Sequence, residues 1–288
     1  MSLPTMPTPG AAATTPRVVR RGGLDVLTWP SLTGLGVDAV VTTRNGGVSR
    51  GPYASLNLGL HVGDDPEAVV ENRTRALAAV DARPEDAVFC VQSHGRAVHV
   101  ATDADRGRGA RDQADAVPET DALVTATPGL VLVVMVADCV PIVLLDPEAG
   151  VLAAVHAGWR GTLARVTAAA VETMTGLGAR PDRIVAGVGP AVAPSRYEVG
   201  PEVAEAARTC FGADQAAATD GWAPVLRPSP SGRWLFDLWA ANTRVLVESG
   251  VPADSIVVAR TPTGEGGPFF SDRDARPCGR FALLARLT

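Results

Sequence analysis

Residues 130–156 decide the fold of this chain and read LVLVVMVADCVPIVLLDPEAGVLAAVH. Three short apolar runs follow one another in this stretch, at 130–136, 142–145 and 151–156. Apolar runs this short, without polar alternation, are typical of strands buried on both faces. Asp138 and Pro141 interrupt the series, and an uninterrupted membrane helix needs about 18–20 apolar residues. We therefore predict three interior strands of a globular protein.

The segments on either side mix strands and helices. We expect further strands at 38–43, 88–91, 98–101, 184–188, 255–259 and 281–287. We expect helices that begin at Asp65-Pro66 and that cover 161–174, 201–211 and 235–249, a mobile loop at 106–117 and a loop at 213–231. Because the order lacks a strict β-α-β alternation, it favours one compact domain with mixed sheets over a doubly wound fold. The glycine pairs at 107–109 and 187–189 also lack the third glycine of a dinucleotide-binding fingerprint.

Composition excludes several classes of protein. The 288 residues are 46% hydrophobic, and 26 basic against 31 acidic side chains give a formal net charge of -5, so there is no electrostatic footprint for nucleic acid or an anionic membrane. Every basic residue is arginine, which excludes a Schiff-base lysine and the lysine-containing phosphate loop.

Four cysteines without a C-x-x-C pair, and a start without signal-peptide features, favour the cytoplasm. We expect residues 1–22 to be a disordered tail and residues 23–288 to form the catalytic domain.

Three of the histidines and cysteines stand at the ends of apolar strands, in polar contexts that contain glycine. They are His94 in VQSHG, Cys139 in ADCVP and His156 in VHAGWRG. The separations of 45 and 17 residues are too wide for a local zinc knuckle but suit strand ends that converge in one cleft. Two imidazoles and a thiolate are good ligands for Zn²⁺, and three ligands leave a fourth position for water or substrate. Asp138 is then a candidate partner behind the metal ligands or a proton acceptor.

Two other interpretations fit the same residues. Cys139 and His156 alone can form a nucleophile–base pair, with His94 as a bystander. Alternatively, a lone cysteine between strands only packs, and a histidine at a strand end only satisfies backbone groups. The remaining histidines and cysteines are assigned structural roles: His61, His99, Cys90, Cys210 and Cys278.

Six strings carry a resemblance to a known family, in the order VTTRNGGVSRGPYASLNLGLHVGDDPEAVVENR, ETDALVT, ADCVPIVLLDP, VHAGWRG, VGPAV…YEVG and FFSDRDARPCGRFALLARL. Over residues 24–287 the chain resembles the YfiH-like laccase-domain family, also named multicopper polyphenol oxidases and purine nucleoside phosphorylases. The resemblance implies a single α+β domain of mixed β-sheets packed together and covered by helices, in α/β/β/α layers. It also implies a zinc site formed by His94, Cys139 and His156. The implied activities are phosphorolysis of adenosine, inosine, guanosine and methylthioadenosine to free base and ribose 1-phosphate, and adenosine deamination.

Counting histidines tests the oxidase name. A type 1 copper takes about two histidines and a cysteine. The two histidines that then remain are too few for the additional copper cluster of a multicopper oxidase. We therefore expect one Zn²⁺ per chain, with a single adventitious copper as the less favoured alternative, and we do not expect laccase chemistry.

Phosphorolysis requires a phosphate site, and without lysine this role falls to arginine. Arg44 is the first choice, with Arg160 and Arg273 behind it, although each has a structural alternative. Asn57 is a candidate for positioning the nucleoside. Phe270, with Phe269, is a candidate wall for the purine, although paired phenylalanines are more often core. In the deaminase branch zinc activates water for attack on the adenine carbon, and Asp138 is the nearest candidate for the acid/base group.

The chain departs from the family's usual residues at six positions while the proposed ligands are unchanged: Ser93, Ser195, Arg196, Thr261, Asp272 and Asp274. These departures leave the nucleoside preference open. A metal-free Cys/His hydrolase and a non-catalytic binding protein on the same scaffold therefore remain competing hypotheses. The expected partners are purine nucleosides and phosphate, with no nucleic acid and no membrane.

Overall fold

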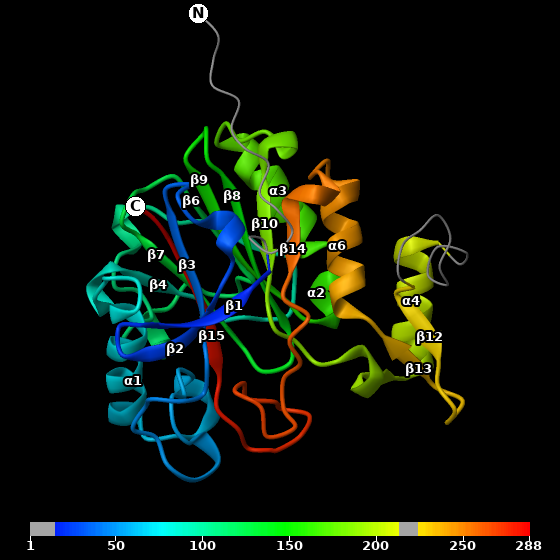
Figure 1. The fold of residues 1–288 in the computed structure, drawn as a ribbon, viewed down its shortest axis with the longest axis horizontal. Coiled ribbons are helices and arrows are strands. Elements are labelled where there is room, and N and C mark those ends of the chain that lie inside the picture. The colour runs from blue at the N-terminus through cyan, green and yellow to red at the C-terminus, as the bar shows by residue number, and fades with distance from the viewer. Residues whose placement is uncertain (1–14, 213–223) are drawn as a thin grey trace, which may run out of the picture.

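Two six-stranded sheets and one small sheet form the β-structure of the residues that the structure describes (Figure 1). The computed structural model describes residues 15–212 and 224–288. The first sheet has the order β1 (Arg17–Arg21), β2 (Leu24–Thr28), β3 (Val37–Thr42), β15 (Phe281–Leu287), β7 (Val131–Val136), β4 (Ala87–Phe89). The second has the order β14 (Ile256–Val258), β10 (Val185–Val188), β8 (Val140–Asp146), β9 (Val151–Ala157), β6 (Ala122–Thr125), β5 (Val98–Val100). The small sheet is β11 (Glu198–Val199), β13 (Trp234–Phe236), β12 (Leu226–Pro228).

Both large sheets are mixed, as the sequence predicted. Most neighbours are antiparallel, including β3–β15–β7 in the first sheet and β6–β9–β8–β10 in the second. Parallel pairs occur where β4 meets β7, where β5 meets β6 and where β10 meets β14. The three central apolar runs therefore divide between the sheets: β7 lies in the first, and β8 and β9 lie in the second.

The facing sides of the two sheets form one apolar core. Val41, Val134 and Leu283 of the first sheet belong to the same buried cluster as Val143, Leu145 and Leu152 of the second. At the β10 end, Gly187 lies so close to Trp29 that a methyl group on it would stand 2.8 Å from the indole ring. Each strand of the centre is covered on both faces, which explains why its sequence shows no polar alternation.

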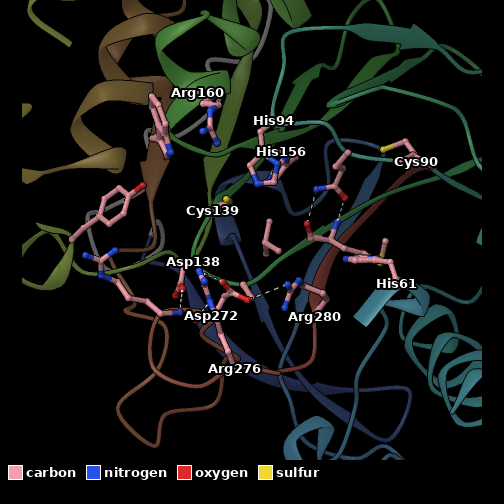
Figure 2. A pocket seen from close by; sticks show the side chains of 18 of the residues that line it. His61, Cys90, His94, Asp138, Cys139, His156, Arg160, Asp272, Arg276 and Arg280 are labelled. Carbon is pink, nitrogen blue, oxygen red and sulfur yellow. Dashed lines mark hydrogen bonds and ion pairs between the residues drawn. The ribbon is translucent and has the colours of Figure 1, made fainter. Parts of the chain in front are cut away.

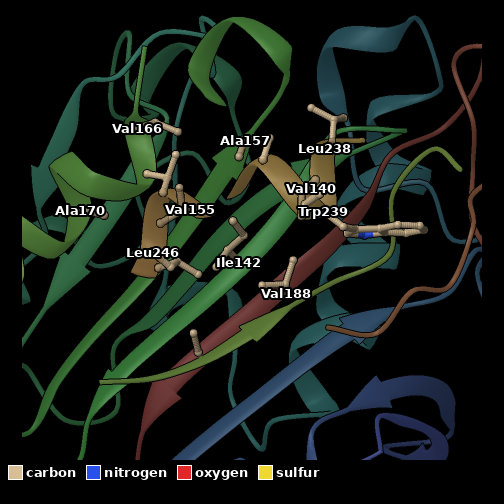
Figure 3. Packing of buried hydrophobic residues seen from close by; sticks show 14 of the residues in the cluster. Val140, Ile142, Val155, Ala157, Val166, Ala170, Val188, Leu238, Trp239 and Leu246 are labelled. Atoms are coloured by element: carbon tan, nitrogen blue, oxygen red, sulfur yellow. The ribbon is translucent and has the colours of Figure 1, made fainter. Parts of the chain in front are cut away.

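Helices cover the two outer faces. The helix α1 (Pro66–Ala78) packs on the first sheet through a buried cluster that includes Leu77, Val131 and Leu284. On the other side lie α2 (Trp159–Leu163), α3 (Val166–Gly176) and α6 (Leu238–Glu248), and Figure 3 shows Val166, Ala170 and Leu246 from these helices against strand residues such as Val155. The helix α4 (Pro201–Phe211) contacts α2 and β13. This arrangement confirms the predicted α+β fold in α/β/β/α layers.

Several predicted elements differ from the structure. The helix predicted at 161–174 is divided into α2 and α3, because Arg165 between them has a left-handed backbone with φ 63°. The helix predicted at 235–249 begins only at Leu238, since the residues before it pair in β13. The loop predicted at 213–231 contains β12, and its residues 213–223 lie outside the described part of the chain.

Two segments predicted to be mobile or disordered carry ordered structure. Arg17–Arg21 of the predicted 1–22 tail forms β1 and pairs with β2, whereas residues 1–14 lie outside the described part of the chain. Segment 106–117 has neither strand nor α-helix, but hydrogen bonds fasten it, including Gly109 N–H to Asp115 Oδ1 at 2.7 Å. In the described residues no helix has both the length and the apolar character needed to cross a membrane.

Candidate metal centre

Three strand ends bring His94, Cys139 and His156 together. The strands β4 and β7 are parallel neighbours, so the loops that follow them, which carry His94 and Cys139, leave the sheet at the same edge. The register of β8 with β9 pairs Pro141 with His156 and brings the third residue to this edge. The candidate ligand atoms of the three residues all lie within 4.8 Å of one another, and Figure 2 shows the two imidazoles beside the sulfur. His94 is exposed, Cys139 is half-buried and His156 is buried.

Local backbone features permit this close approach. His94 has a left-handed backbone with φ 60°, which turns the chain sharply after β4. Gly158 follows β9, and a methyl group on it would stand 2.9 Å from Cys139 Sγ and 2.9 Å from His94 Cδ2. Only glycine leaves this space to the two side chains.

Asp121, which the sequence analysis did not single out, supports the cluster from behind. Its buried carboxylate bonds His156 Nδ1 at 2.8 Å and accepts the backbone N–H groups of His94 at 3.0 Å and Gly95 at 2.7 Å. Burial raises the pKa of Asp121, but the bond to His156 and its charge outweigh that effect and hold the pKa at about 2. Because Asp121 engages Nδ1, the other ring nitrogen of His156 is left for the cluster. The sequence feature that could have indicated Asp121 is its position directly before the apolar residues of β6 (Ala122–Thr125).

The electrostatics of the cluster favour a cation. Burial raises the pKa of Cys139, but the charge of His156 and hydrogen bonds from His156 and His94 outweigh it and lower the pKa to about 6. Burial lowers the pKa of His156, and the thiolate of Cys139 with Asp121 more than compensates and raises it to about 9. A thiolate and two imidazoles held in this space fit Zn²⁺, which takes nitrogen and sulfur ligands. Three protein ligands would leave a fourth coordination position for water or substrate, and all three residues line a cavity.

A cavity of about 630 Å³ adjoins the cluster. The aromatic side chains of Trp159 and Tyr197 line it, and a guanidinium stacks on each: Arg160 lies 4.5 Å from the Trp159 ring centroid and Arg273 lies 5.2 Å from that of Tyr197. Neither arginine forms an ion pair with a carboxylate of the described residues. The cavity wall therefore combines two aromatic rings with two guanidinium groups that have no carboxylate counter-ion in the described part of the chain.

Asp138 lies in the cavity wall, but its carboxylate is engaged. Thr263 donates its hydroxyl to Oδ1 at 2.5 Å, and the backbone N–H of Arg273 donates to Oδ2 at 2.8 Å. Asp138 thus fastens the segment that carries Arg273 beside the His94–Cys139–His156 cluster. The carboxylate that orients an imidazole of the cluster is Asp121 and not Asp138.

The structure does not bring Arg44, Asn57 or Phe270 into this cavity. Arg44 donates two hydrogen bonds to the Ala54 carbonyl, at 3.1 and 2.9 Å, and stacks on Phe270. Phe270 is 1% exposed in the core between the sheets, as is its neighbour Phe269 at 0%. Asn57 is buried, and its side chain accepts the backbone N–H groups of Gly59 and Arg280. All three side chains therefore stabilise the loops around the site.

Conversely, the cavity includes residues that the sequence analysis had assigned to structure or passed over. His61 lies on its wall, and burial with the charges of Arg280 and Arg73 lowers the pKa of His61 to about 4. Cys90 also lines the cavity, and burial raises the pKa of its thiol. The other lining residues that had been passed over include Gln92, Gln113, Arg276 and Arg280.

Departures from the family pattern form bonds of their own. Ser93 donates its hydroxyl to Asp121 at 3.0 Å and so adds a bond to the carboxylate behind the cluster. Arg196 pairs with Asp274 at 2.6 Å and with Glu265 at 3.2 Å, outside the cavity wall. Thr261 donates to the Ala259 carbonyl at 3.1 Å. These substitutions leave His94, Cys139 and His156 in place.

Comparison with known proteins gives consistent matches along the chain. The sequence pattern of a family described as multi-copper polyphenol oxidoreductase laccase matches residues 38–288. A purine nucleoside phosphorylase of Deinococcus radiodurans is 44% identical over 259 residues, covering 90% of this chain and 91% of that protein. Adenosine deaminase RL5, from an unknown prokaryotic organism, is 40% identical over 240 residues, covering 83% of this chain and 88% of that protein.

Solved structures agree with the fold. The crystal structure of YlmD from Geobacillus stearothermophilus superimposes with a TM-score of 0.83 at 37% identity, covering 91% of this chain and 96% of that one. The Bacillus licheniformis hypothetical protein YfiH gives a TM-score of 0.85 at 32% identity with the same coverage. The resemblance predicted from the sequence strings and the single-domain fold are confirmed.

Proposed function

The chain belongs to the multi-copper polyphenol oxidoreductase laccase family, and from this membership and its site we propose that it is a zinc-dependent purine nucleoside phosphorylase that also deaminates adenosine. The observation that carries the proposal is the convergence of His94, Cys139 and His156 on a cavity with two arginines, Arg160 and Arg273, that have no carboxylate partner among the described residues. The substrates in this proposal are adenosine, inosine, guanosine and methylthioadenosine. Free thiols at all four cysteines fit a cytoplasmic location.

His94, Cys139 and His156 would hold the metal. Zinc, when bound, supplies Lewis-acid stabilisation of developing negative charge and activates water at neutral pH. Asp121 keeps His156 in the tautomer that has Nε2 free, because it engages Nδ1. The same carboxylate holds the backbone of His94 and Gly95, so both histidines keep their positions when substrate enters.

Arg160 and Arg273 are the residues that we assign to phosphate. A guanidinium fork suits a phosphate oxygen pair, and both side chains lie over aromatic rings of the cavity wall. Asp138 positions Arg273 through the backbone N–H bond. The rings of Trp159 and Tyr197 provide apolar faces for a purine. Arg44 has no part in this assignment.

The two reactions use the same cavity. In phosphorolysis a phosphate oxygen bonds to the anomeric carbon of the ribose while the bond from that carbon to the purine nitrogen breaks. The purine leaves with the bonding electron pair and takes up a proton, which gives free base and ribose 1-phosphate. In deamination water adds to the adenine carbon that bears the amine, and ammonia leaves, which gives inosine.

A second candidate rests on one specific observation. Asp121, His156 and Cys139 form a chain of bonded groups in the order acid, imidazole and thiol, which is the arrangement of a metal-free cysteine hydrolase. The presence of His94 favours a metal site over a cysteine hydrolase, because a hydrolase has no use for a second imidazole at the same sulfur. Loss of the proposed activity on chelation, and its return with zinc, would exclude the metal-free reading.

The proposal is tested by incubating the zinc-loaded protein with inosine or adenosine, with and without phosphate, and separating the products by chromatography. We expect hypoxanthine from inosine only when phosphate is present, and inosine from adenosine without phosphate. If neither product forms with zinc fully loaded, the enzymatic proposal fails and a non-catalytic binding role is favoured.

A further inference from the structure

One acidic side chain holds two of the arginines that line the cavity. Asp272 Oδ2 lies 2.6 Å from Arg276 Nη2, and Asp272 Oδ1 lies 3.2 Å from Arg280 Nη2. The two oxygens of one carboxylate therefore pair with two different guanidinium groups. This is the arrangement that a phosphate group forms with an arginine pair. In the view of Figure 2 these three residues lie below the metal ligands, and Arg160 lies above them.

The same residues also line a second cavity. This neighbouring space has a volume of about 420 Å³ and shares four residues with the first: His61, Asp272, Arg276 and Arg280. The Arg276 side chain is 77% exposed and that of Arg280 is 21% exposed, so the pair extends from solvent to the interior. The wall between the two cavities thus carries two guanidinium groups and the Asp272 carboxylate that pairs with both.

The remaining bonds of these residues hold them in place but leave their charges available. Arg280 Nη1 donates to the carbonyls of Cys278 and Gly279, at 3.1 and 3.2 Å. These bonds fix the orientation of the guanidinium group without neutralising its charge. Arg276 Nε donates to the Asp272 carbonyl at 3.0 Å. Asp272 is the one carboxylate of the described residues that pairs with either arginine. Its removal would leave two adjacent guanidinium groups without a counter-ion.

We propose that Arg276 and Arg280 form a second phosphate subsite, which the Asp272 carboxylate holds closed. A phosphate group that enters from either cavity must displace Asp272, because both compete for the same guanidinium donors. The ligand class is a phosphate group, either inorganic phosphate or the phosphate of a nucleoside monophosphate. For a nucleotide ligand the inference rests on the proposed function. For inorganic phosphate it does not, because phosphate binding is measurable without turnover.

The test is calorimetric titration of the zinc-loaded full-length protein with inorganic phosphate in a phosphate-free buffer. We expect Asp272→Asn to bind phosphate about fivefold tighter than the wild type or better, because one close repulsive charge and one competitor are removed. Asp274→Asn is the matched control, since it makes the same change in the same segment but breaks a pair with Arg196 outside the cavity wall. It should change the affinity less than about twofold. Adding Arg276→Gln to Asp272→Asn should abolish the gain.

The proposal is overturned if Asp272→Asn gains no affinity, if Asp274→Asn gains as much, or if the gain survives Arg276→Gln. Titration with inosine 5′-monophosphate and with inosine identifies the source of the phosphate. Tighter binding of the monophosphate with unchanged inosine supports a nucleotide phosphate, and tighter binding of inorganic phosphate alone supports free phosphate. A wild type that releases no base from inosine, beside a gain in Asp272→Asn, would overturn the proposed function and leave the subsite standing.

Discussion

At the scale of single residues, Asp121 controls most of the geometry of the His94–Cys139–His156 cluster. Its carboxylate bonds the His156 ring and the backbone of His94, and it is fully buried where water cannot replace it. An amide in its place donates as well as accepts, so it cannot satisfy all of these N–H groups. The orientation of His156 and of the loop that carries His94 should therefore depend on this one side chain.

We expect Asp121→Asn to weaken zinc affinity about 10- to 100-fold, the usual cost of losing a carboxylate behind a metal-bound histidine. Competition with a chromophoric chelator measures this affinity. Asp105→Asn is the matched control, because Asp105 is also buried and also pairs with a histidine, His99 at 3.1 Å, outside the cluster. Wild-type zinc affinity in Asp121→Asn would contradict the assignment.

The arginines give a second prediction at this scale. Arg160→Gln and Arg273→Gln should each raise the KM for phosphate by about tenfold or more, because a charged hydrogen bond to phosphate is lost. Arg44→Gln should leave that KM unchanged and lower the free energy of unfolding by about 1 kcal/mol, since its bonds go to the Ala54 carbonyl. Initial rates against phosphate concentration and chemical denaturation give the two quantities. A larger KM effect from Arg44→Gln would reverse the assignment.

The sequence predicted which three residues come together at the strand ends but not which residues support them. His94, Cys139 and His156 were selected because histidine and cysteine are scarce and stand at strand ends. Asp121 was missed, because it is one of 31 acidic residues and its partners lie 27 and 35 positions away. Arg44 was chosen for its glycine-rich turn, yet that turn needs the arginine for its own backbone.

At the scale of elements, the turn from β9 into α2 forms one wall of the centre. Gly158 lies there with its α-carbon facing Cys139 and His94, and the next glycine, Gly161, faces the Gly95 carbonyl. The close approach of this turn to two ligand segments explains why glycine occurs at both positions. A side chain on the turn would separate the elements that carry His94 and Cys139.

We expect Gly158→Ala to displace Cys139 or His94 and to lower zinc occupancy by more than about tenfold, with the free energy of unfolding reduced by about 1–3 kcal/mol. Elemental analysis and chemical denaturation measure the two effects. Gly176→Ala, at the end of α3, meets nothing within 4 Å, so it should leave zinc occupancy unchanged and should not lower the free energy of unfolding. Full zinc occupancy in Gly158→Ala would show that the turn is not tightly packed on the ligands.

Periodicity predicted most elements well but not their interruptions. The strands from the central apolar runs and the helix α4 lie where the sequence predicted them. The break between α2 and α3 was missed, because arginine does not signal a left-handed backbone. The strands β12 and β13 were missed because each is three residues long and gains its pairing from its neighbour.

At the scale of the whole molecule, the contact between the two large sheets holds the strand ends in register. Leu145 of β8 lies fully buried in the cluster between the sheets. We expect Leu145→Ala to reduce the free energy of unfolding by about 2–5 kcal/mol, because a cavity opens between the sheets. Leu177→Ala, at a site 37% exposed, should change it by less than about 0.5 kcal/mol. Denaturant titration measures both, and similar values for the two variants would contradict this description of the core.

The resemblance predicted the layered architecture, and the pattern of elements predicted mixed sheets. Neither predicted the order of the strands within each sheet. Strand β15 pairs with β3, and Ala282 N–H bonds the Thr42 hydroxyl across 240 positions. Such pairings depend on the whole set of strands, so periodicity within one strand carries no information about them.

Zinc content tests the central claim that three distant residues form one metal centre. Purified wild-type protein, desalted to remove loosely held ions, should contain one zinc per chain by elemental analysis, and His94→Ala, Cys139→Ala and His156→Ala should each lose it. His99→Ala, which changes a histidine outside the cluster, should retain it. Stoichiometric zinc in any of the three ligand variants, or a wild type that takes up no zinc, would contradict the account.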